Sequence, residues 1–172
     1  INVLDHHVVP DGATQNADAL QALIDRNEGG GTLLFPPGTY LTGGLILRSG
    51  VTLHLESGAT LRGSTRIQDY PHIDPPPEAF HEGAQGVRAL LFALDASDIT
   101  ITGRGTIDGQ GGRFEAPPGV RAGRPRVIWF GRCRNVTVED LALRNSAFWM
   151  QHYMKCVGLR LLHLDVWNHG GA

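Results

Sequence analysis

The side chains best suited to binding chemistry gather in one short stretch, NSAFWMQHYMKC at positions 145–156. An aromatic face can stack on a flat apolar surface of a ligand, and imidazole and amide groups can hydrogen-bond hydroxyl or carboxylate oxygens. We therefore expect Trp149 and His152, together with Gln151, to line a binding site. Rings at such a place can instead fill a turn against the core, and we expect this of Phe148.

Positive charge concentrates just before this stretch. Six arginines fall within 22 positions, with Glu115 as the one acidic residue among them: Arg113, Arg121, Arg124, Arg126, Arg132 and Arg134. Such a cluster would attract an acidic polymer, although arginines on a loop can equally be solvated. Arg132 and Lys155, which are 23 positions apart, form the better candidate pair for an anionic ligand.

The sequence predicts neither a metal nor a cofactor. Four candidate ligands crowd the C-terminal end, namely His152, His163, Asp165 and His169. They match no known ligand spacing, and alternation along a strand would divide them among different faces. The glycine pairs are not followed by a helix, so they form neither a phosphate loop nor a nucleophile turn.

The aspartates offer no convincing acid–base pair for hydrolysis. Asp95, Asp98 and Asp108 stand beside turns, where aspartate commonly hydrogen-bonds the local backbone. Asp165 alternates with apolar neighbours that we expect to point inward, so its own carboxylate is expected to face solvent.

Composition bounds the class of protein. A chain of 172 residues suits one domain with a sizeable core. A net charge of −2 argues against nucleic-acid or anionic-membrane binding, and no apolar run is long enough for a transmembrane helix. Cys133 and Cys156 make no disulfide framework or metal motif, and we expect both to be buried as small hydrophobic residues.

One helix and many short strands are predicted. The segment NADALQALID has apolar residues at helical spacing, with Asn16 as its N-cap and the glycines at 29–31 as its end. From Thr32 onward, short strands or strand pairs alternate with turn residues. They are expected at 31–35, 44–55, 59–63, 89–94, 97–107, 126–130, 135–145 and 157–168.

Two of these segments match at a fixed offset of 23 residues. The series Cys133, Asn135, Val136, Val138, Leu141, Leu143 and Asn145 recurs as Cys156, Gly158, Leu159, Leu161, Leu164, Val166 and Asn168. Ala96, Ile99 and Ile101 precede the first series by 37. Such a repeat indicates a parallel β-solenoid, whereas a β-sandwich or jelly roll gives no reason for it.

The predicted fold is therefore all-β, with a helical cap at about 14–28 that shields the edge strands and with rungs over 32–172. Cys133 over Cys156 and Asn145 over Asn168 are expected to form internal ladders, the asparagines satisfying backbone groups at a turn.

Several segments resemble right-handed β-helix carbohydrate enzymes: DGATQNADALQALID, GGGTLLFPPGTYLTGGLILRSGVTLHLESGATLRGS and ITITGRGTIDGQG. With RPRVIWFGRCRNVTVEDLALRNSAFWMQHYMKC, the sequence resembles the polygalacturonase-type glycoside hydrolases, family 28, over nearly its whole length. The resemblance implies a right-handed single-stranded parallel β-helix of the pectin-lyase-like type. It also implies inverting hydrolysis of galacturonan or rhamnogalacturonan by aspartates without a metal, and a secreted or periplasmic location.

The sequence departs from that family in its catalytic motifs. Asn-x-Asp, Asp-Asp, His-Gly and Arg-x-Lys should follow in this order, but the carboxylate motifs have no counterpart in 1–172, and His169-Gly170 precedes any of them. We therefore expect the catalytic aspartates beyond residue 172, one rung below Met150 to Tyr153. On the same resemblance, we expect Trp149 and His152, together with Gln151, to line a sugar subsite. Arg132 and Lys155 are the candidate pair for an anionic sugar. The chain is then expected to be the N-terminal portion of a single β-helix domain, inactive by itself.

Two other functions stay open from the sequence. One is a polysaccharide lyase of the same architecture, which would eliminate across a uronate ring with a basic group. The other is a non-catalytic carbohydrate-binding or tailspike-type β-helix. The expected partner in each case is a polysaccharide, pectic for the hydrolase.

Overall fold

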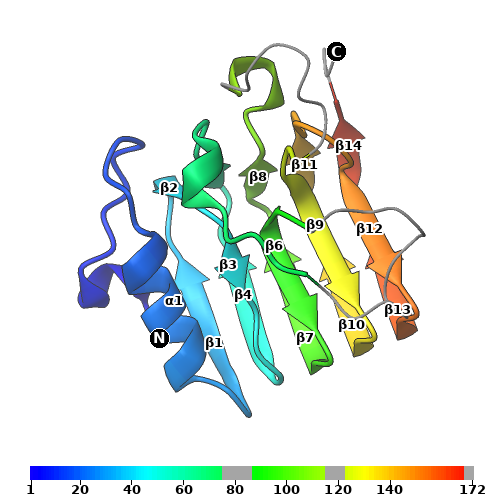
Figure 1. Cartoon of the computed structure of the whole chain (residues 1–172). Coiled ribbons are helices and arrows are strands. Elements are labelled where there is room, and N and C mark those ends of the chain that lie inside the picture. The colour runs from blue at the N-terminus through cyan, green and yellow to red at the C-terminus, as the bar shows by residue number, and fades with distance from the viewer. Residues whose placement is uncertain (75–86, 115–122, 169–172) are drawn as a thin grey trace.

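The computed structural model describes residues 1–74, 87–114 and 123–168. These residues wind into a right-handed parallel β-helix in which successive rungs stack side by side from the N-terminal to the C-terminal end (Figure 1). The described strands form three sheets, here called sheets A, B and C, and each full turn of the chain adds one strand to each sheet in that order.

All strand pairs within the sheets are parallel. Sheet A contains β1 (Gly31–Phe35), β4 (Val51–Leu55), β7 (Ser97–Gly103), β10 (Arg134–Glu139) and β13 (Val157–Leu162). Sheet B contains β2 (Gly38–Thr42), β5 (Ala59–Gly63), β8 (Thr106–Asp108), β11 (Ala142–Arg144) and β14 (Asp165–Trp167). Sheet C contains β3 (Leu45–Ile46), β6 (Ala89–Leu94), β9 (Arg126–Gly131) and β12 (Gln151–Met154).

The pairing register confirms the repeat seen in the sequence. Val136 lies opposite Leu159, 23 residues on, and opposite Ile99, 37 residues back. Leu143 likewise lies opposite Val166. The two strands that the sequence did not predict are β2, which Pro37 and Gly43 flank closely, and β12, which lies inside the aromatic stretch.

The core is the column of side chains that the three sheets enclose. Burial alternates along the strands, so that β4 directs Val51, Leu53 and Leu55 inward and the residues between them outward. Cys133 is fully buried and Cys156 is partly buried on the next rung, where its Sγ donates to the carbonyl oxygen of Phe130 at 3.4 Å. The prediction of a cysteine ladder packed with the core is thus confirmed.

The asparagine ladder was predicted on the wrong side of the sheet. Asn145 does not point into the core, and its side-chain nitrogen donates to the carboxylate of Asp108 at 3.1 Å rather than to a backbone group. The reason is that Asn145, with a φ of 50°, stands at the corner where the chain leaves sheet B, and this left-handed backbone turns its side chain outward.

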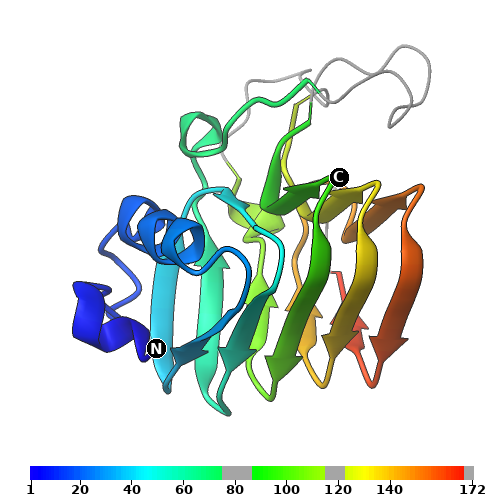
Figure 2. The same ribbon diagram turned by 90° about the horizontal axis from the view of Figure 1, so that it is seen from below.

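A short helix caps the N-terminal end of the stack (Figure 2). The helix α1 (Ala17–Arg26) buries Leu20, Leu23 and Ile24, and it ends before the glycines that were expected to stop it. Asn16 precedes the helix, but its side chain bonds to the backbone of Val9 and Leu41 instead of capping α1.

The free edges of β1 and β2 are covered by extended chain, whereas that of β3 is covered by α1, whose Gln21 side chain bonds the backbone amide and carbonyl of Ile46 at 2.8 and 2.9 Å. The amide of Leu34 in β1 donates to the carbonyl of Ile1 at 2.8 Å, and the amide of Gly12 donates to the carbonyl of Thr39 in β2 at 2.8 Å. The 3-10 turn η1 (Val3–His6) lies between these segments, and further 3-10 turns are η2 (Ile67–Asp69) and η4 (Gly111–Arg113). Hence the helix closes the core and shields the edge of sheet C, as predicted, while backbone pairing protects the edges of sheets A and B.

Candidate functional site

The outer face of sheet C carries a column of large side chains in register. Ile46, Phe92, Trp129 and His152 occupy equivalent positions on β3, β6, β9 and β12. The rings of Phe92 and Trp129 stack with centroids 4.9 Å apart and planes 9° apart. They pack with Val87 and Ile73, which are joined by an antiparallel bridge, so this part of the outer face forms a second buried cluster.

At β12, the last described strand of sheet C, the side chain in this column is partly exposed to solvent. The His152 ring lies edge-on to Trp129, with a centroid distance of 6.3 Å, and to Trp149, at 4.6 Å. Phe148 stacks on Trp149 with centroids 5.3 Å apart and planes 7° apart. Trp149 keeps 44% and Phe148 39% of its surface exposed, which contradicts the prediction that Phe148 packs against the core.

The exposure of these two rings follows from the path of the chain. Between β11 and β12 the side chains of Ser146 and Ala147 are buried, and the Ser146 hydroxyl donates to the carbonyl of Trp149 at 2.8 Å. This bond closes a tight turn, so the two rings that stand within it are directed outward.

Arg126 completes the group. Its guanidinium carbon lies 5.0 Å from the ring centroid of Phe148 and 5.2 Å from that of Trp149, a cation–π arrangement. Burial lowers the pKa of Arg126. Among the described residues its Nε has no hydrogen-bond partner and no carboxylate forms an ion pair with it. Arg126, Phe148, Trp149 and His152 are called the aromatic–arginine surface below.

The sequence held a signal for this pairing. Arg126 precedes Trp149 by 23 residues, the offset of the repeat, and the amide of its neighbour Val127 donates to the carbonyl of Trp149 at 3.2 Å. The cluster of arginines pointed to this region but did not single out Arg126.

Gln151 lies on the opposite face of β12 from His152. It pairs in register with Ile128 of the core, and its Oε1 accepts a hydrogen bond from the hydroxyl of Tyr153 at 2.8 Å. Burial raises the pKa of the Tyr153 hydroxyl. The expectation that Gln151 joins Trp149 and His152 therefore does not fit the geometry, because strand residues alternate between faces.

Arg132 and Lys155 stand at the corner between sheets C and A, with the same left-handed φ of 52°. They are in equivalent turns of successive rungs, as expected. Arg132 makes a two-pronged ion pair with Asp95 of the preceding rung, in which its Nε lies 2.7 Å from Oδ1. This guanidinium holds the pKa of Asp95 below its usual range. Lys155 follows His152 by three strand residues, about 10 Å, so the structure separates this pair from the aromatic–arginine surface.

The other aspartates mostly join neighbouring rungs. Asp98 accepts from the side-chain nitrogen of Asn135 at 3.0 Å instead of bonding the local backbone as predicted. Asp108 does accept from a nearby backbone amide, that of Gln110 at 3.0 Å. Asp165 points outward as predicted, where it forms an ion pair with Arg144.

No cluster of three or more potential metal ligands occurs within 1–74, 87–114 and 123–168. His163 instead contacts Asp140, with Nδ1 and Oδ1 3.0 Å apart. His169 and Arg121, named as candidates from the sequence, lie outside the described residues. In the described part of the chain, no helix has the length and apolar character needed to cross a membrane.

Comparison with known proteins gives a consistent family and fold. Residues 1–149 match the family model described as rhamnogalacturonase A/epimerase, pectate lyase-like. A Vitis vinifera protein named "Probable polygalacturonase" is 35% identical over 164 residues, which are 88% of this chain and 33% of that protein. The exo-poly-alpha-D-galacturonosidase of Dickeya chrysanthemi is 36% identical over 126 residues, which are 67% of this chain and 20% of that protein.

A solved structure supports the fold. The exopolygalacturonase of Thermotoga maritima superposes with a TM-score of 0.82 over 99% of this chain and 47% of that chain, at 24% identity. This chain thus spans about a third of the length of the Vitis relative and a fifth of the Dickeya relative.

Proposed function

The chain belongs to the rhamnogalacturonase A/epimerase, pectate lyase-like family, and from this we propose that it takes part in the hydrolysis of a pectic polysaccharide. The two curated relatives carry names for enzymes that act on galacturonan, which supports galacturonan as the polymer. Such polymers lie outside the cytoplasm, so we expect the protein to act there.

The observation that carries this proposal is the aromatic–arginine surface. A galacturonate unit has an apolar ring face and a carboxylate, and the surface offers a partner to each. The exposed ring of Trp149 can stack on the sugar, while Arg126, whose charge no described carboxylate neutralises, can bind the carboxylate. His152 stands against Trp149 and can donate to a sugar hydroxyl.

The proposed role of these residues is to bind and orient the substrate rather than to cleave the glycosidic bond. Inverting hydrolysis needs two carboxyl groups about 6.5–9.5 Å apart, one to protonate the leaving oxygen and one to activate water. None of the four residues of the surface is acidic. The carboxylates of Asp95, Asp98, Asp108 and Asp165 are each bonded to a neighbouring rung.

Of the predicted pair Arg132 and Lys155, Lys155 remains the proposed second contact for an acidic sugar. Because Asp95 neutralises the Arg132 guanidinium, Lys155 is the exposed cation of this pair. A galacturonan chain that extends along β12 from the aromatic–arginine surface would reach it.

The proposal is tested with polygalacturonate and with defined oligogalacturonides. We expect the 172-residue chain to bind trigalacturonate and not a neutral galactose trisaccharide in isothermal titration calorimetry. In a protein that contains these residues and cleaves polygalacturonate, we expect saturated products of inverted configuration by NMR. Products that absorb as unsaturated uronides would instead show a lyase, and binding without turnover would show a carbohydrate-binding module.

The 172-residue chain alone is expected to release no reducing ends, because the sequence predicts no acid–base pair among its aspartates. In the cleaving protein, Trp149→Ala and His152→Ala should each lower kcat/KM. An unchanged kcat/KM for both variants would remove the aromatic–arginine surface from the proposed substrate path.

A further inference from the structure

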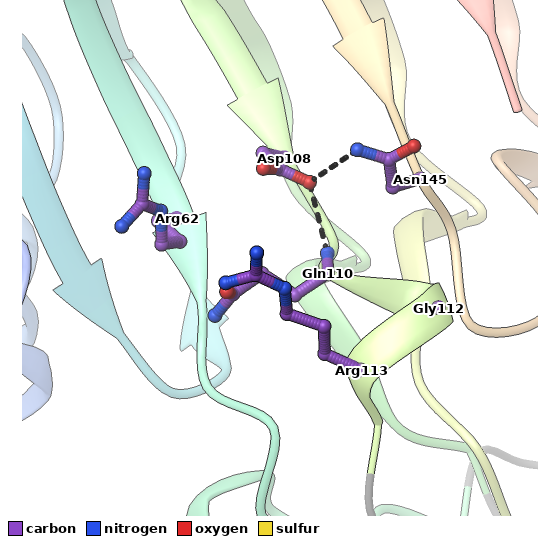
Figure 3. A pocket seen from close by; sticks show the side chains of 6 residues that line it. All are labelled: Arg62, Asp108, Gln110, Gly112, Arg113 and Asn145. Carbon is purple, nitrogen blue, oxygen red and sulfur yellow. Dashed lines mark hydrogen bonds between the residues drawn. The ribbon is translucent and has the colours of Figure 1, made fainter. Parts of the chain in front are cut away.

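A hollow lies where the chain leaves sheet B (Figure 3). It has a volume of about 380 Å³, and its lining comes from β5, β8, the turn η4 and the segment after β11: Arg62, Asp108, Gln110, Gly112, Arg113 and Asn145. A neighbouring hollow of about 650 Å³ shares Arg62, Gln110 and Arg113 with it and extends to Gly12 and Gln15. The two together are called the arginine groove.

Backbone pairing and a fixed set of hydrogen bonds build the floor of the groove. Arg62 and Asp108 lie opposite each other on β5 and β8. The Oδ1 of Asp108 accepts from the backbone amide of Gln110 at 3.0 Å and from the side-chain nitrogen of Asn145 at 3.1 Å (Figure 3). The Nε2 of Gln110 donates to the carbonyl of Gly63 at 2.6 Å, which ties the floor to the preceding rung.

The free charge of the groove is positive. Among the described residues, no carboxylate forms an ion pair with Arg62 or Arg113. The other acid of the lining, Asp69, is occupied: Arg66 pairs with it at 3.0 Å, and the side chains of Ser64 and Gln15 donate to it. Two unpaired guanidinium groups thus face one carboxylate, that of Asp108.

This lining combines the groups that an acidic saccharide needs. A guanidinium binds a carboxylate through two parallel hydrogen bonds, and the amide and carboxylate groups on the floor can accept from or donate to hydroxyls. The groove crosses β2, β5, β8 and the segment after β11, which are three rung spacings or about 14 Å. That length holds more than one sugar ring.

We propose that the arginine groove is a second binding site for uronate-containing saccharide, separate from the aromatic–arginine surface. Its residues come from β5, β8, η4 and Asn145, which directly follows β11, whereas those of the surface come from β9, β12 and the later part of the connection between β11 and β12. The choice of uronate as the acidic sugar rests on the proposed function. The site would hold a stretch of the polymer away from the residues that orient it at sheet C.

The test measures trigalacturonate binding to the 172-residue chain by isothermal titration calorimetry and by NMR titration. Arg62→Gln and Arg113→Gln remove the two unpaired charges, and Arg134→Gln, on the exposed side of sheet A, is the matched control. Trp149→Ala removes the ring of the other site. Thermal unfolding by circular dichroism checks that each variant is folded.

We expect two classes of site in the unaltered chain. Arg62→Gln and Arg113→Gln should each weaken one class about tenfold, the double variant should abolish it, and Arg134→Gln should change it less than twofold. Trp149→Ala should leave this class intact. Inorganic phosphate, at the same concentration, should bind it more weakly than trigalacturonate.

Three outcomes overturn the proposal. If Arg134→Gln weakens binding as much as Arg113→Gln does, the effect is one of net charge only. If phosphate binds as tightly as trigalacturonate, the groove is an anion site that does not recognise sugar. If Trp149→Ala alone abolishes binding, trigalacturonate engages only sheet C, and the proposed function survives without the groove. If the unaltered chain shows the groove class but no sheet C class, the result would instead count against the proposed function.

Discussion

Trp129 and Trp149 lie close together at sheet C, yet they have opposite surroundings. Trp129 is 1% exposed, stacked on Phe92 and covered by Val87, whereas Trp149 is 44% exposed and stacked on Phe148. His152 touches both indole rings. The His152 ring therefore lies between the buried cluster and the aromatic–arginine surface and contacts both.

This contrast shows that the type of residue does not decide its role on a β-helix. The outer face of a rung is buried only where another segment of chain lies over it, as Val87 and Ile73 do beside Trp129. Where a ring has no such cover, it keeps an apolar face that can meet a ligand. The four predictions below test this division, beginning with the largest effect.

Trp129→Ala should destabilise the protein by about 3–5 kcal/mol, because it leaves a cavity among Phe92, Val87 and neighbouring residues. Trp149→Ala should cost less than about 1 kcal/mol, since its ring is already partly in water. Urea unfolding followed by circular dichroism measures both values. Equal losses of stability for the two variants would contradict the division between the buried cluster around Trp129 and the aromatic–arginine surface.

Trp149→Ala should in turn weaken trigalacturonate binding at sheet C about tenfold, which corresponds to about 1.4 kcal/mol of lost ring stacking. Trp149→Phe should retain most of the affinity because it keeps an aromatic face. Calorimetric titration measures this effect. If the alanine and phenylalanine variants bind equally well, Trp149 does not stack on the sugar.

The two arginines beside sheet C should differ in the same manner. Arg126→Gln should weaken trigalacturonate binding several-fold and reduce its dependence on salt, because the charge of Arg126 has no described carboxylate partner. Arg132→Gln should change affinity less than twofold, because Asp95 already neutralises Arg132. Titrations at two salt concentrations test both variants, and a larger effect at Arg132 would reverse the assignment.

The cysteine ladder should show the smallest difference, one of reactivity. The hydrogen bond from Cys133 lowers the pKa of Cys156 to about 7, and together with burial the same contact raises that of Cys133. Since the thiolate is the reactive form, alkylation of Cys156 by iodoacetamide should rise as pH increases through about 7. Cys133, which is fully buried, should stay unmodified in the folded chain.

Mass spectrometry after alkylation at several pH values distinguishes the two thiols. In Cys133→Ala the donor to Cys156 is lost, so the pH at which Cys156 reacts should move upward. An unchanged pH profile in that variant would show that the ladder contact does not set the reactivity of Cys156.

Much of the architecture was predictable from the sequence for a physical reason. Equivalent residues of a solenoid pack on one another at every rung, so the chain must repeat its apolar pattern at the length of one turn. Val136, Leu159 and Ile99 show this, because their spacing in sequence is their pairing register. The helix at 17–26 was likewise evident from its apolar face.

The structure brings together only some of the residues of the predicted site. Trp149 and His152 do come together, but Gln151 turns to the other face of β12 and Phe148 proves to be exposed. Strand β12 was not predicted, and without it the alternation of Gln151 and His152 could not be assigned. Arg126 was not distinguished from the other five arginines of its cluster, although it lies 23 residues before Trp149, which is the offset of the repeat.

The sequence by itself determined the rung length and the inward apolar residues, because both depend on a pattern that recurs along the chain, and its motifs carried the resemblance to the family. Only the tertiary structure decided which outward rings are covered, which arginines meet a carboxylate and where hollows form. These depend on contacts between rungs and on the connecting segments, as when Asp95 reaches Arg132 while Arg126 rests on two open rings. The repeat of apolar residues can be seen in the sequence itself. The burial of outward rings and the pairing of arginines with carboxylates depend on segments that are distant in the sequence and meet only in the folded protein.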